Sequence, residues 1–289
     1  MLDHAATDIF VKLDDFMIAA IKGKNGPESA GSENEKWLFR LKNRNKDRKL
    51  SLSEAACLLM LFQLSTCQSL KMFLFFNGRE LAAMFPNLPS YATCVSWLAR
   101  TEAFLVDFIH ANLAKPGDRS SVYAIDSTKI DPHKLKNNPK CMRANARIGH
   151  SHEGMWLGWK LHVLANRAGE IVAWDWSGGN VHDLAPVKGG MLRGICGKCF
   201  ADSGYVSAQV RQDLLPQDLL FVAKPTKAMG DARWIFDKFW AAAYRQRQVV
   251  EGVFSRLKSR LGLVAQGARS PASARCRALA SVALHCLGF

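Results

Sequence analysis

YRQRQVVEGVFSRLK, residues 244–258, is the stretch of sequence from which the rest of the chain can be interpreted. It contains no proline and one glycine, Gly252, so we expect it to form a helix. At about 100° per residue, four polar residues of this helix fall within an arc of roughly 60°. They are Tyr244, Arg247, Glu251 and Lys258. Such a face is either a solvated surface of mixed charge or a carboxylate directed into a metal site, with cations beside it that bind phosphate.

The composition is that of a globular protein with a basic surface. A length of 289 residues is enough for one large domain or two ordinary ones. A content of 48% hydrophobic and 22% charged residues is typical of a globular protein with a full core. A formal net charge of +14 favours a polyanionic partner, most often nucleic acid, over the alternative of a membrane surface. No apolar run approaches the roughly 20 residues of a spanning helix. The N-terminus carries acids where a signal peptide carries cations. We therefore expect a cytoplasmic, nucleoid-associated protein that does not bind membranes.

Residues 1–115 are predicted to form an all-helical N-terminal region that binds DNA. A capping box, Ser51-Leu-Ser-Glu54, marks the start of one helix, and Lys115-Pro-Gly-Asp118 ends the region. No turn signature identifies a helix-turn-helix within it. The expected helices cover residues 5–20, 52–64, 67–76, 78–85 and 90–114.

A basic segment, KWLFRLKNRNKDRK at residues 36–49, lies within this region. It holds seven lysines and arginines against a single acid, Asp47, and aromatic residues interleave with the charge. A solvated basic face is one interpretation, but in a chain this basic the pattern favours contact with phosphates. The predicted DNA contacts of the segment are Arg40, Lys42 and Arg44.

Residues 116–289 are predicted to form a second, α/β domain. Strands are expected at 121–125, 159–165 and 171–176, and the turn Asn166-Arg-Ala-Gly169 joins the last two into a hairpin. A short helix at 183–192, a strand at 198–201, a helix at 206–214 and a strand at 219–223 follow, before a long helix over 232–258. This order predicts a mixed sheet with helices on its faces.

Two of these strands are followed directly by aspartates, Asp126 and Asp202. Each alone is typical of a turn or a cap, but reactive groups of α/β proteins gather at the carboxyl ends of neighbouring strands. Together with Glu251 they supply three hard oxygen ligands, which suit Mg²⁺ or Mn²⁺. Two such ions can activate a water or a 3′-hydroxyl and stabilise the leaving oxygen of an in-line displacement.

The order of elements resembles the ribonuclease-H-like fold, and the residues resemble the DDE transposases of bacterial insertion sequences. Residues 244–258 match the Y-(2)-R-(3)-E-(6)-K signature of that group at all four positions. Ile125-Asp126-Ser127 resembles its first acidic motif, and Asp202-Ser-Gly204-Tyr205 its second, D-x-G-Y. The runs Gly158-Trp-Lys-Leu-His162 and Gly179-Asn-Val-His-Asp183 resemble its hairpin and the loop that follows. The resemblance covers most of the chain.

The resemblance implies roles for individual residues. Asp126, Asp202 and Glu251 would be the catalytic metal ligands. Arg247 and Lys258 would contact DNA phosphates near the scissile bond, and Tyr244 would help to position the strand. Lys160, in the predicted hairpin, is a further expected DNA contact. Lys224 stands in a segment where many relatives carry an arginine, and lysine lacks the bidentate fork of that side chain.

The function implied is that of a transposase with a ribonuclease-H-like catalytic domain at 116–289. It would bind the terminal inverted repeats of its own element, cleave them with metal-activated water, and join the 3′-hydroxyl to target DNA as a homodimer on DNA. Two alternatives remain open at this point: a metal-dependent nuclease without strand transfer, and a catalytically silent DNA-binding descendant. The silent descendant predicts loss of an acidic or signature residue, and no such loss is seen.

Overall fold

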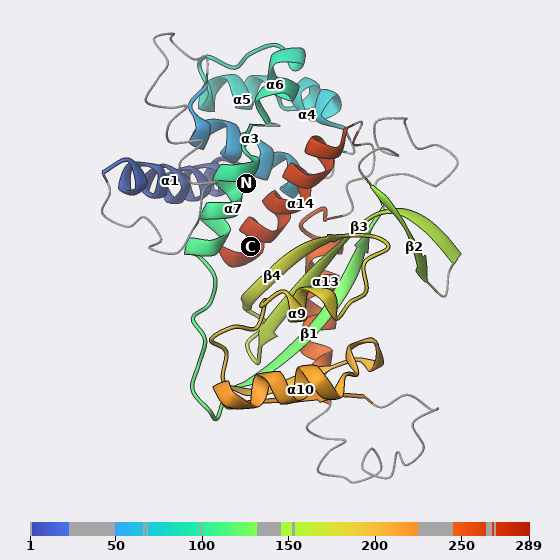
Figure 1. Cartoon of the computed structure of the whole chain (residues 1–289). Helices are drawn as coiled ribbons and strands as arrows, with labels where there is room; N and C mark the ends of the chain where they lie inside the picture. The colour runs from blue at the N-terminus through green and yellow to red at the C-terminus, as the bar shows by residue number, and fades with distance from the viewer. Residues whose placement is uncertain are drawn as a thin grey trace. The chain divides into compact units, whose positions relative to one another are not determined.

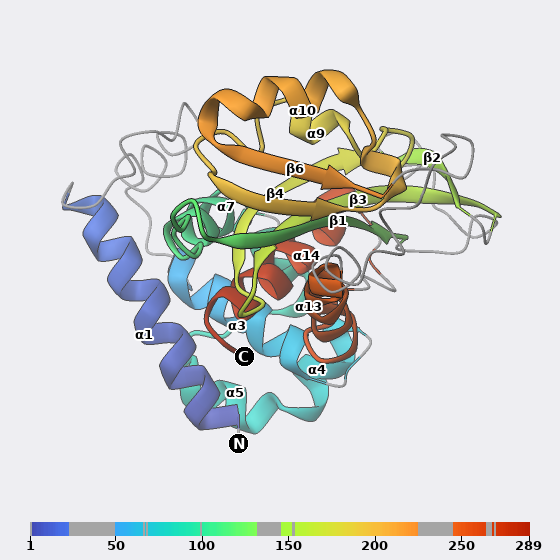
Figure 2. The same cartoon turned by 90° about the horizontal axis from the view of Figure 1, so that it is seen from below.

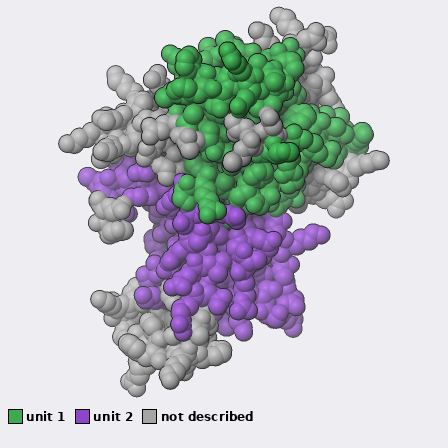
Figure 3. All heavy atoms as spheres, turned by 180° about the vertical axis from the view of Figure 1, so that it is seen from behind, with its two compact units in different colours: residues 1–112, 259–289 green, residues 113–258 purple. Residues whose placement is uncertain are grey.

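The computed structural model of the chain divides into two compact units. Unit 1 comprises Met1–Asn112 and Ser259–Phe289, and unit 2 comprises Leu113–Lys258 (Figure 3). The structure describes residues 2–22, 50–65, 67, 69–98, 100–131, 146–151, 154–224, 245–263, 268 and 270–289. Within these residues, no helix has the length and apolar character needed to cross a membrane.

Unit 1 is helical in all of its described elements (Figure 1). Helix α3 is apolar around most of its circumference, and eleven of its thirteen residues are buried. Helices α1, α7 and α14 contact one another or α3 to form this core. The helices are α1 (Leu2–Ile21), α3 (Leu52–Leu64), α4 (Leu70–Phe76), α5 (Gly78–Met84), α6 (Tyr91–Leu98), α7 (Glu102–Ala111) and α14 (Pro271–Cys286). The single helix expected over residues 90–114 is therefore two helices, α6 and α7.

The C-terminal residues pack with the N-terminal helices, whereas the predicted domain boundary assigned them to the second domain. A buried polar network explains the packing. The Gln63 side-chain amide donates hydrogen bonds to the Gly262 carbonyl (2.8 Å) and the Ser281 hydroxyl (3.0 Å), and accepts one from Arg277 Nε (3.1 Å). The Arg277 guanidinium also lies 4.8 Å from the centre of the Phe62 ring. Because these buried groups satisfy one another, helix α14 is fixed against α3.

The predicted capping box is formed at the start of α3, and its contribution to stability can be tested by mutation. The Glu54 backbone N–H donates to the Ser51 hydroxyl (3.1 Å), and the Ser51 N–H donates to the Glu54 carboxylate (2.6 Å). We expect Ser51→Ala to lower the free energy of unfolding by about 1 kcal/mol, because a helix N–H loses its acceptor. A urea titration followed by circular dichroism measures this change. Ser96→Ala, at an exposed position within α6, is the control, and an equal loss in both variants would contradict the capping role.

Unit 2 is built on one mixed sheet. Its order is β2-β3-β1-β5-β6. Strand β2 pairs with residues 154–158 of β3, and β4 pairs with residues 159–165 of β3. Strands β2, β3, β4 and β1 pair antiparallel, whereas β1–β5 and β5–β6 pair parallel. The strands are β1 (Val122–Ile130), β2 (Arg147–Ser151), β3 (Gly154–Asn166), β4 (Ile171–Gly178), β5 (Gly197–Ala201) and β6 (Leu219–Ala223). An antiparallel hairpin followed by parallel strands is the predicted arrangement, and the ribonuclease-H-like fold class is confirmed.

Helices cover both faces of this sheet (Figure 2). Helices α9 (Ala185–Lys188) and α10 (Ala208–Leu214) bury Val187 and Val210 in one core with Tyr123 and Ile125 of β1. Helix α13 (Gln248–Ser259) lies on the opposite face. Because side chains alternate along a strand, Asp126 points away from the α9–α10 core and toward the α13 face.

Several predicted elements of unit 2 differ in extent from the structure. Strand β1 does not end at residue 125: it continues to Ile130, paired with β3 throughout. The helix expected over 183–192 is the four-residue α9, which stops at a glycine pair where Gly190 has a φ of +100°. The helix expected over 232–258 is described only from residue 245, as a 3₁₀ turn (Arg245–Arg247) followed by α13.

Candidate active site

Asp126 and Asp202 lie side by side at one edge of the parallel pairing. Ile125 of β1 is in register with Ala201 of β5, and the next residue of each strand is an aspartate. Paired residues on parallel strands face the same side of the sheet, and Asp202 keeps an extended backbone (φ −77°, ψ 174°). The residues that follow Ile125 and Ala201 therefore both point to the α13 face. The neighbouring positions of these two aspartates therefore follow from the pairing of β1 with β5.

Helix α13 brings Glu251 to the same place through an arginine. The Arg247 guanidinium donates one hydrogen bond to Asp126 Oδ2 (3.1 Å) and another to Glu251 Oε1 (2.6 Å). The side chains of Arg247 and Asp126 are 19% and 23% exposed, so this ion pair is partly shielded from water. The helix is anchored by an apolar face on which Val250, Val253, Phe254 and Leu257 are buried. One guanidinium thus joins the carboxylates of β1 and α13.

The electrostatics of this group are those of crowded carboxylates. Burial raises the pKa of the Asp126 carboxyl to about 6, and the charges of Asp202 and Asp183 add to the rise. The Ser127 backbone N–H, which donates to Asp126 Oδ1 (2.8 Å), and the Arg247 guanidinium oppose it. Ionised Asp126 is therefore costly in this place unless a further positive charge is supplied.

The donor set fits a hard divalent cation. Asp126 on β1, Asp202 after β5 and Glu251 on α13 offer carboxylate oxygens, which are the ligands that Mg²⁺ and Mn²⁺ prefer. Across the part of the chain that the structure describes, no three His, Cys, Asp or Glu side chains are close enough to enclose an ion. The positive charge between Asp126 and Glu251 is that of the Arg247 guanidinium, which forms an ion pair with each of them.

A second polar cluster lies on the other face, behind Asp126. We call it the Asp183 cluster, and it consists of Ser127, Lys160, Asp183 and Tyr205. Lys160 Nζ donates to Asp183 Oδ1 (2.8 Å) and to the Val181 carbonyl (2.9 Å). A contact of Lys160 with DNA, which stays a prediction, would have to displace these partners. The sequence signal for the cluster is the run Gly179-Asn-Val-His-Asp183, which ends on Asp183.

His162 lies beside this cluster and has a structural setting. It is fully buried, and its Nε2 is 2.7 Å from the Ser177 hydroxyl. Burial lowers the pKa of His162 to about 4, so the ring is neutral at physiological pH.

The other predicted DNA contacts divide into two groups. Lys224, directly after β6, and Lys258, in the last turn of α13, are exposed. Both belong to unit 2, and both carry cations on the protein surface. The remaining four lie outside the described residues: Tyr244, Arg40, Lys42 and Arg44.

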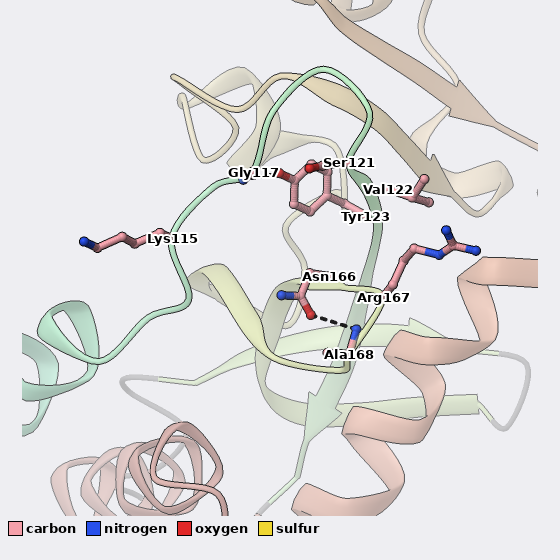
Figure 4. Close-up of a pocket in the computed structure, with 8 residues that line it drawn as sticks. All are labelled: Lys115, Gly117, Ser121, Val122, Tyr123, Asn166, Arg167 and Ala168. Carbon is pink, nitrogen blue, oxygen red and sulfur yellow. Dashed lines mark hydrogen bonds between the residues drawn. The ribbon is translucent and has the colours of Figure 1, made fainter.

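A pocket lies at the far end of β1 from Asp126 and forms no part of this site. It is bounded by the first residues of β1 and by the β3–β4 turn, in which the Ala168 N–H donates to Asn166 Oδ1 (Figure 4). The Lys115 side chain points away from the pocket, so its charge does not converge with that of Arg167. The lining residues are Lys115, Gly117, Ser121, Val122, Tyr123, Asn166, Arg167 and Ala168.

Comparison with known proteins gives one family. A family model described as "Transposase DDE domain" matches residues 116–269, a range that includes Asp126, Asp202 and Glu251. Among solved structures, a chain of a pre-cleavage Mos1 transpososome aligns over 98% of this chain and 97% of its own. The identity is 13% and the TM-score 0.21, a similarity too low to support an argument. No curated protein matches the chain at a significant level.

Proposed function

The chain belongs to the transposase DDE domain family, and from that premise we propose that it cleaves DNA at the ends of a bacterial insertion sequence and joins those ends to target DNA. One observation supports this proposal most directly: Asp126 and Asp202 directly follow the paired residues Ile125 and Ala201, and Arg247 joins Asp126 to Glu251. Asp126 is thus linked to both of the other acids, through the β1–β5 pairing to Asp202 and through one guanidinium to Glu251.

Asp126, Asp202 and Glu251 would hold the divalent metal, Mg²⁺ or Mn²⁺, as two ions. When bound, the metal supplies Lewis-acid activation of a water or a 3′-hydroxyl and neutralises charge on the leaving oxygen. The signature match at residues 244–258 supports the assignment of Glu251 as the third acid.

Cations around the three acids would hold the DNA backbone. Arg247 has a planar fork that can exchange its two carboxylate partners for two oxygens of one phosphate. Lys258 and Lys224 are exposed point charges suited to less directional phosphate contacts. Tyr244 would help to position the strand, and the basic segment at 36–49 would bind end DNA from the N-terminal region. Joining two ends requires two copies of the chain, so a homodimer on DNA is part of the proposal.

Incubation with DNA that carries both ends of the element tests the proposal. With Mg²⁺, the protein should nick each end at one position and then join the new 3′-hydroxyl to a second duplex. A sequencing gel maps the nicks, and a labelled target detects the joined product. Glu251→Gln, which keeps the side-chain shape, should give neither product.

The same assay separates the alternatives. A nuclease of this fold would give nicks without joined product, and a silent descendant would bind end DNA without cutting it. Either result with the wild-type protein would overturn the proposed strand transfer.

A further inference from the structure

Asp183 connects three segments around Asp126 through one oxygen atom. It lies in the loop between β4 and α9, and its Oδ1 accepts hydrogen bonds from Ser127 Oγ and Lys160 Nζ, both at 2.8 Å. Ser127 belongs to β1 and Lys160 to β3. The side chains of Lys160 and Asp183 are 16% and 30% exposed. A short, partly buried, charge-assisted pair of this kind is directional and holds its members in place.

Strand β1 needs such support at this point. Its parallel pairing with β5 ends at Ile125, whereas its antiparallel pairing with β3 continues to Ile130. From Asp126 onward, the described sheet therefore holds β1 on one side only. Ser127 is the next residue: its hydroxyl donates to Asp183, and its backbone N–H donates to Asp126 Oδ1 (2.8 Å). A continuous chain of hydrogen bonds thus runs from Asp183 through Ser127 to the Asp126 carboxylate.

The turn that carries Asp202 also lies against Asp183. A Cβ atom placed on Gly204 would be 3.5 Å from Asp183 Oδ2, which is ordinary van der Waals contact. Tyr205 is 1% exposed, and burial raises the pKa of its phenol, with the charges of Asp183 and Asp126 adding to the rise. The D-x-G-Y turn therefore packs against Asp183.

We propose that Asp183 is a positioning residue, which fixes the Asp126 carboxylate relative to Asp202 by holding Ser127, Lys160 and the D-x-G-Y turn. The inference rests on the proposed function of Asp126 and Asp202 as metal ligands. Asp183 acts on Asp126 through Ser127, and contacts neither substrate nor metal. Lys160 balances its charge.

Two other roles for Asp183 fit the geometry less well. As a metal ligand it would have to join Asp202 and Glu251, yet Ser127, to which it is bonded, points to the face opposite Asp126. Its Oδ1 is also already shared by two donors. As a cap for α9 it would have to accept from a backbone N–H of that helix. The N-cap residue is Leu184, and no side chain caps the helix.

Three variants test this role. Electron paramagnetic resonance measures how tightly each variant binds Mn²⁺ in the absence of DNA. Asp183→Ala removes the acceptor, and should weaken both Mn²⁺ affinity and end cleavage by about 10- to 100-fold, as loss of outer-shell partners typically does. Asp183→Asn keeps a carbonyl oxygen for both donors, and should recover most of the loss. Ser127→Ala removes only the hydroxyl of the link, and should weaken affinity in the same direction. Asp213→Ala, an exposed acid of α10, is the control for lost charge and should bind as wild type.

The results can overturn the proposal in two ways. If Asp183→Asn binds Mn²⁺ as poorly as Asp183→Ala, Asp183 acts as a ligand or by its charge. If Ser127→Ala and Asp183→Ala both bind as wild type, the link has no role. The variant that combines Ser127→Ala with Asp183→Ala should bind Mn²⁺ no more weakly than Asp183→Ala alone, because both changes break the same chain of hydrogen bonds. Should Asp183→Ala fail to fold, Ser127→Ala and Asp183→Asn decide between these outcomes.

A failure of the proposed function would look different. In that case the wild-type protein itself would neither bind Mn²⁺ nor cleave end DNA. A crystal structure of Asp183→Ala or Ser127→Ala then still tests the positioning role. We expect the Asp126 carboxylate to turn away and its bond to the Ser127 N–H to be lost. An unmoved Asp126 would contradict the inference.

Discussion

Asp126→Ala is expected to abolish Mg²⁺-dependent cleavage of end DNA, with a fall of at least about 1,000-fold. Asp126 is the acid that links the other two: it and Asp202 follow the paired residues Ile125 and Ala201, and Arg247 joins it to Glu251. Metal ions contribute several kcal/mol of transition-state stabilisation in such reactions, and each 1.36 kcal/mol is a factor of ten in rate. Single-turnover nicking of labelled end DNA measures the loss, and a gel-shift assay should show that DNA binding is retained.

Asp126→Asn separates this loss from misfolding. In metal-free protein, the folded-state pKa of Asp126 is about 6, above its ordinary 3.8, so its ionisation disfavours the folded state as pH rises between these values. The asparagine variant lacks this cost. Its thermal midpoint at pH 7 should therefore equal or exceed that of the wild type, while its cleavage is lost. Full cleavage by either variant would refute the assignment of Asp126, and Asp213→Asn controls for a neutralised acid elsewhere in unit 2.

The parts of the site that could be predicted from sequence are those set by local pattern. The strands at 198–201 and 219–223 are short apolar runs between turn signals, and parallel neighbours of this kind end at one edge. That reasoning is sufficient to place Asp202 beside Asp126. The hairpin at Asn166–Gly169 follows from turn chemistry, since Gly169 has a φ of +80°.

What the sequence did not reveal depends on contacts between distant residues. Residues 126–130, DSTKI, continue as a strand because β3 supplies a complete antiparallel ladder, although their own polarity suggests a loop. The Ser127–Asp183 bond spans 56 positions, and the Arg277–Gln63 bond that holds α14 spans 214. No periodicity within one segment reports such pairs. The spacing of residues 244–258 likewise placed Arg247 beside Glu251 on a helix, but not against Asp126.

Arg247→Gln is expected to change two measurements in opposite directions. Cleavage of end DNA should fall by about 100- to 1,000-fold, the typical cost of removing one donor that stabilises charge in a transition state. Mn²⁺ affinity without DNA should rise by about tenfold, since a charged hydrogen bond contributes roughly 1.5 kcal/mol and the guanidinium competes with metal for Asp126 and Glu251. Rapid-quench kinetics gives the first value, and paramagnetic titration the second.

The opposite signs decide what Arg247 does. If it only contacts DNA, metal affinity in the absence of DNA stays at the wild-type value. If it only holds the Asp126 and Glu251 side chains in place, its removal makes these carboxylates more mobile, and metal affinity falls. A rise together with slower cleavage is expected only if the same guanidinium holds the carboxylates before metal and DNA arrive and a phosphate afterwards. Arg256→Gln, at an exposed arginine of α13, removes an equal charge and should leave metal affinity unchanged. Arg247→Lys should cleave at an intermediate rate, because lysine keeps the charge without the fork that spans two oxygens.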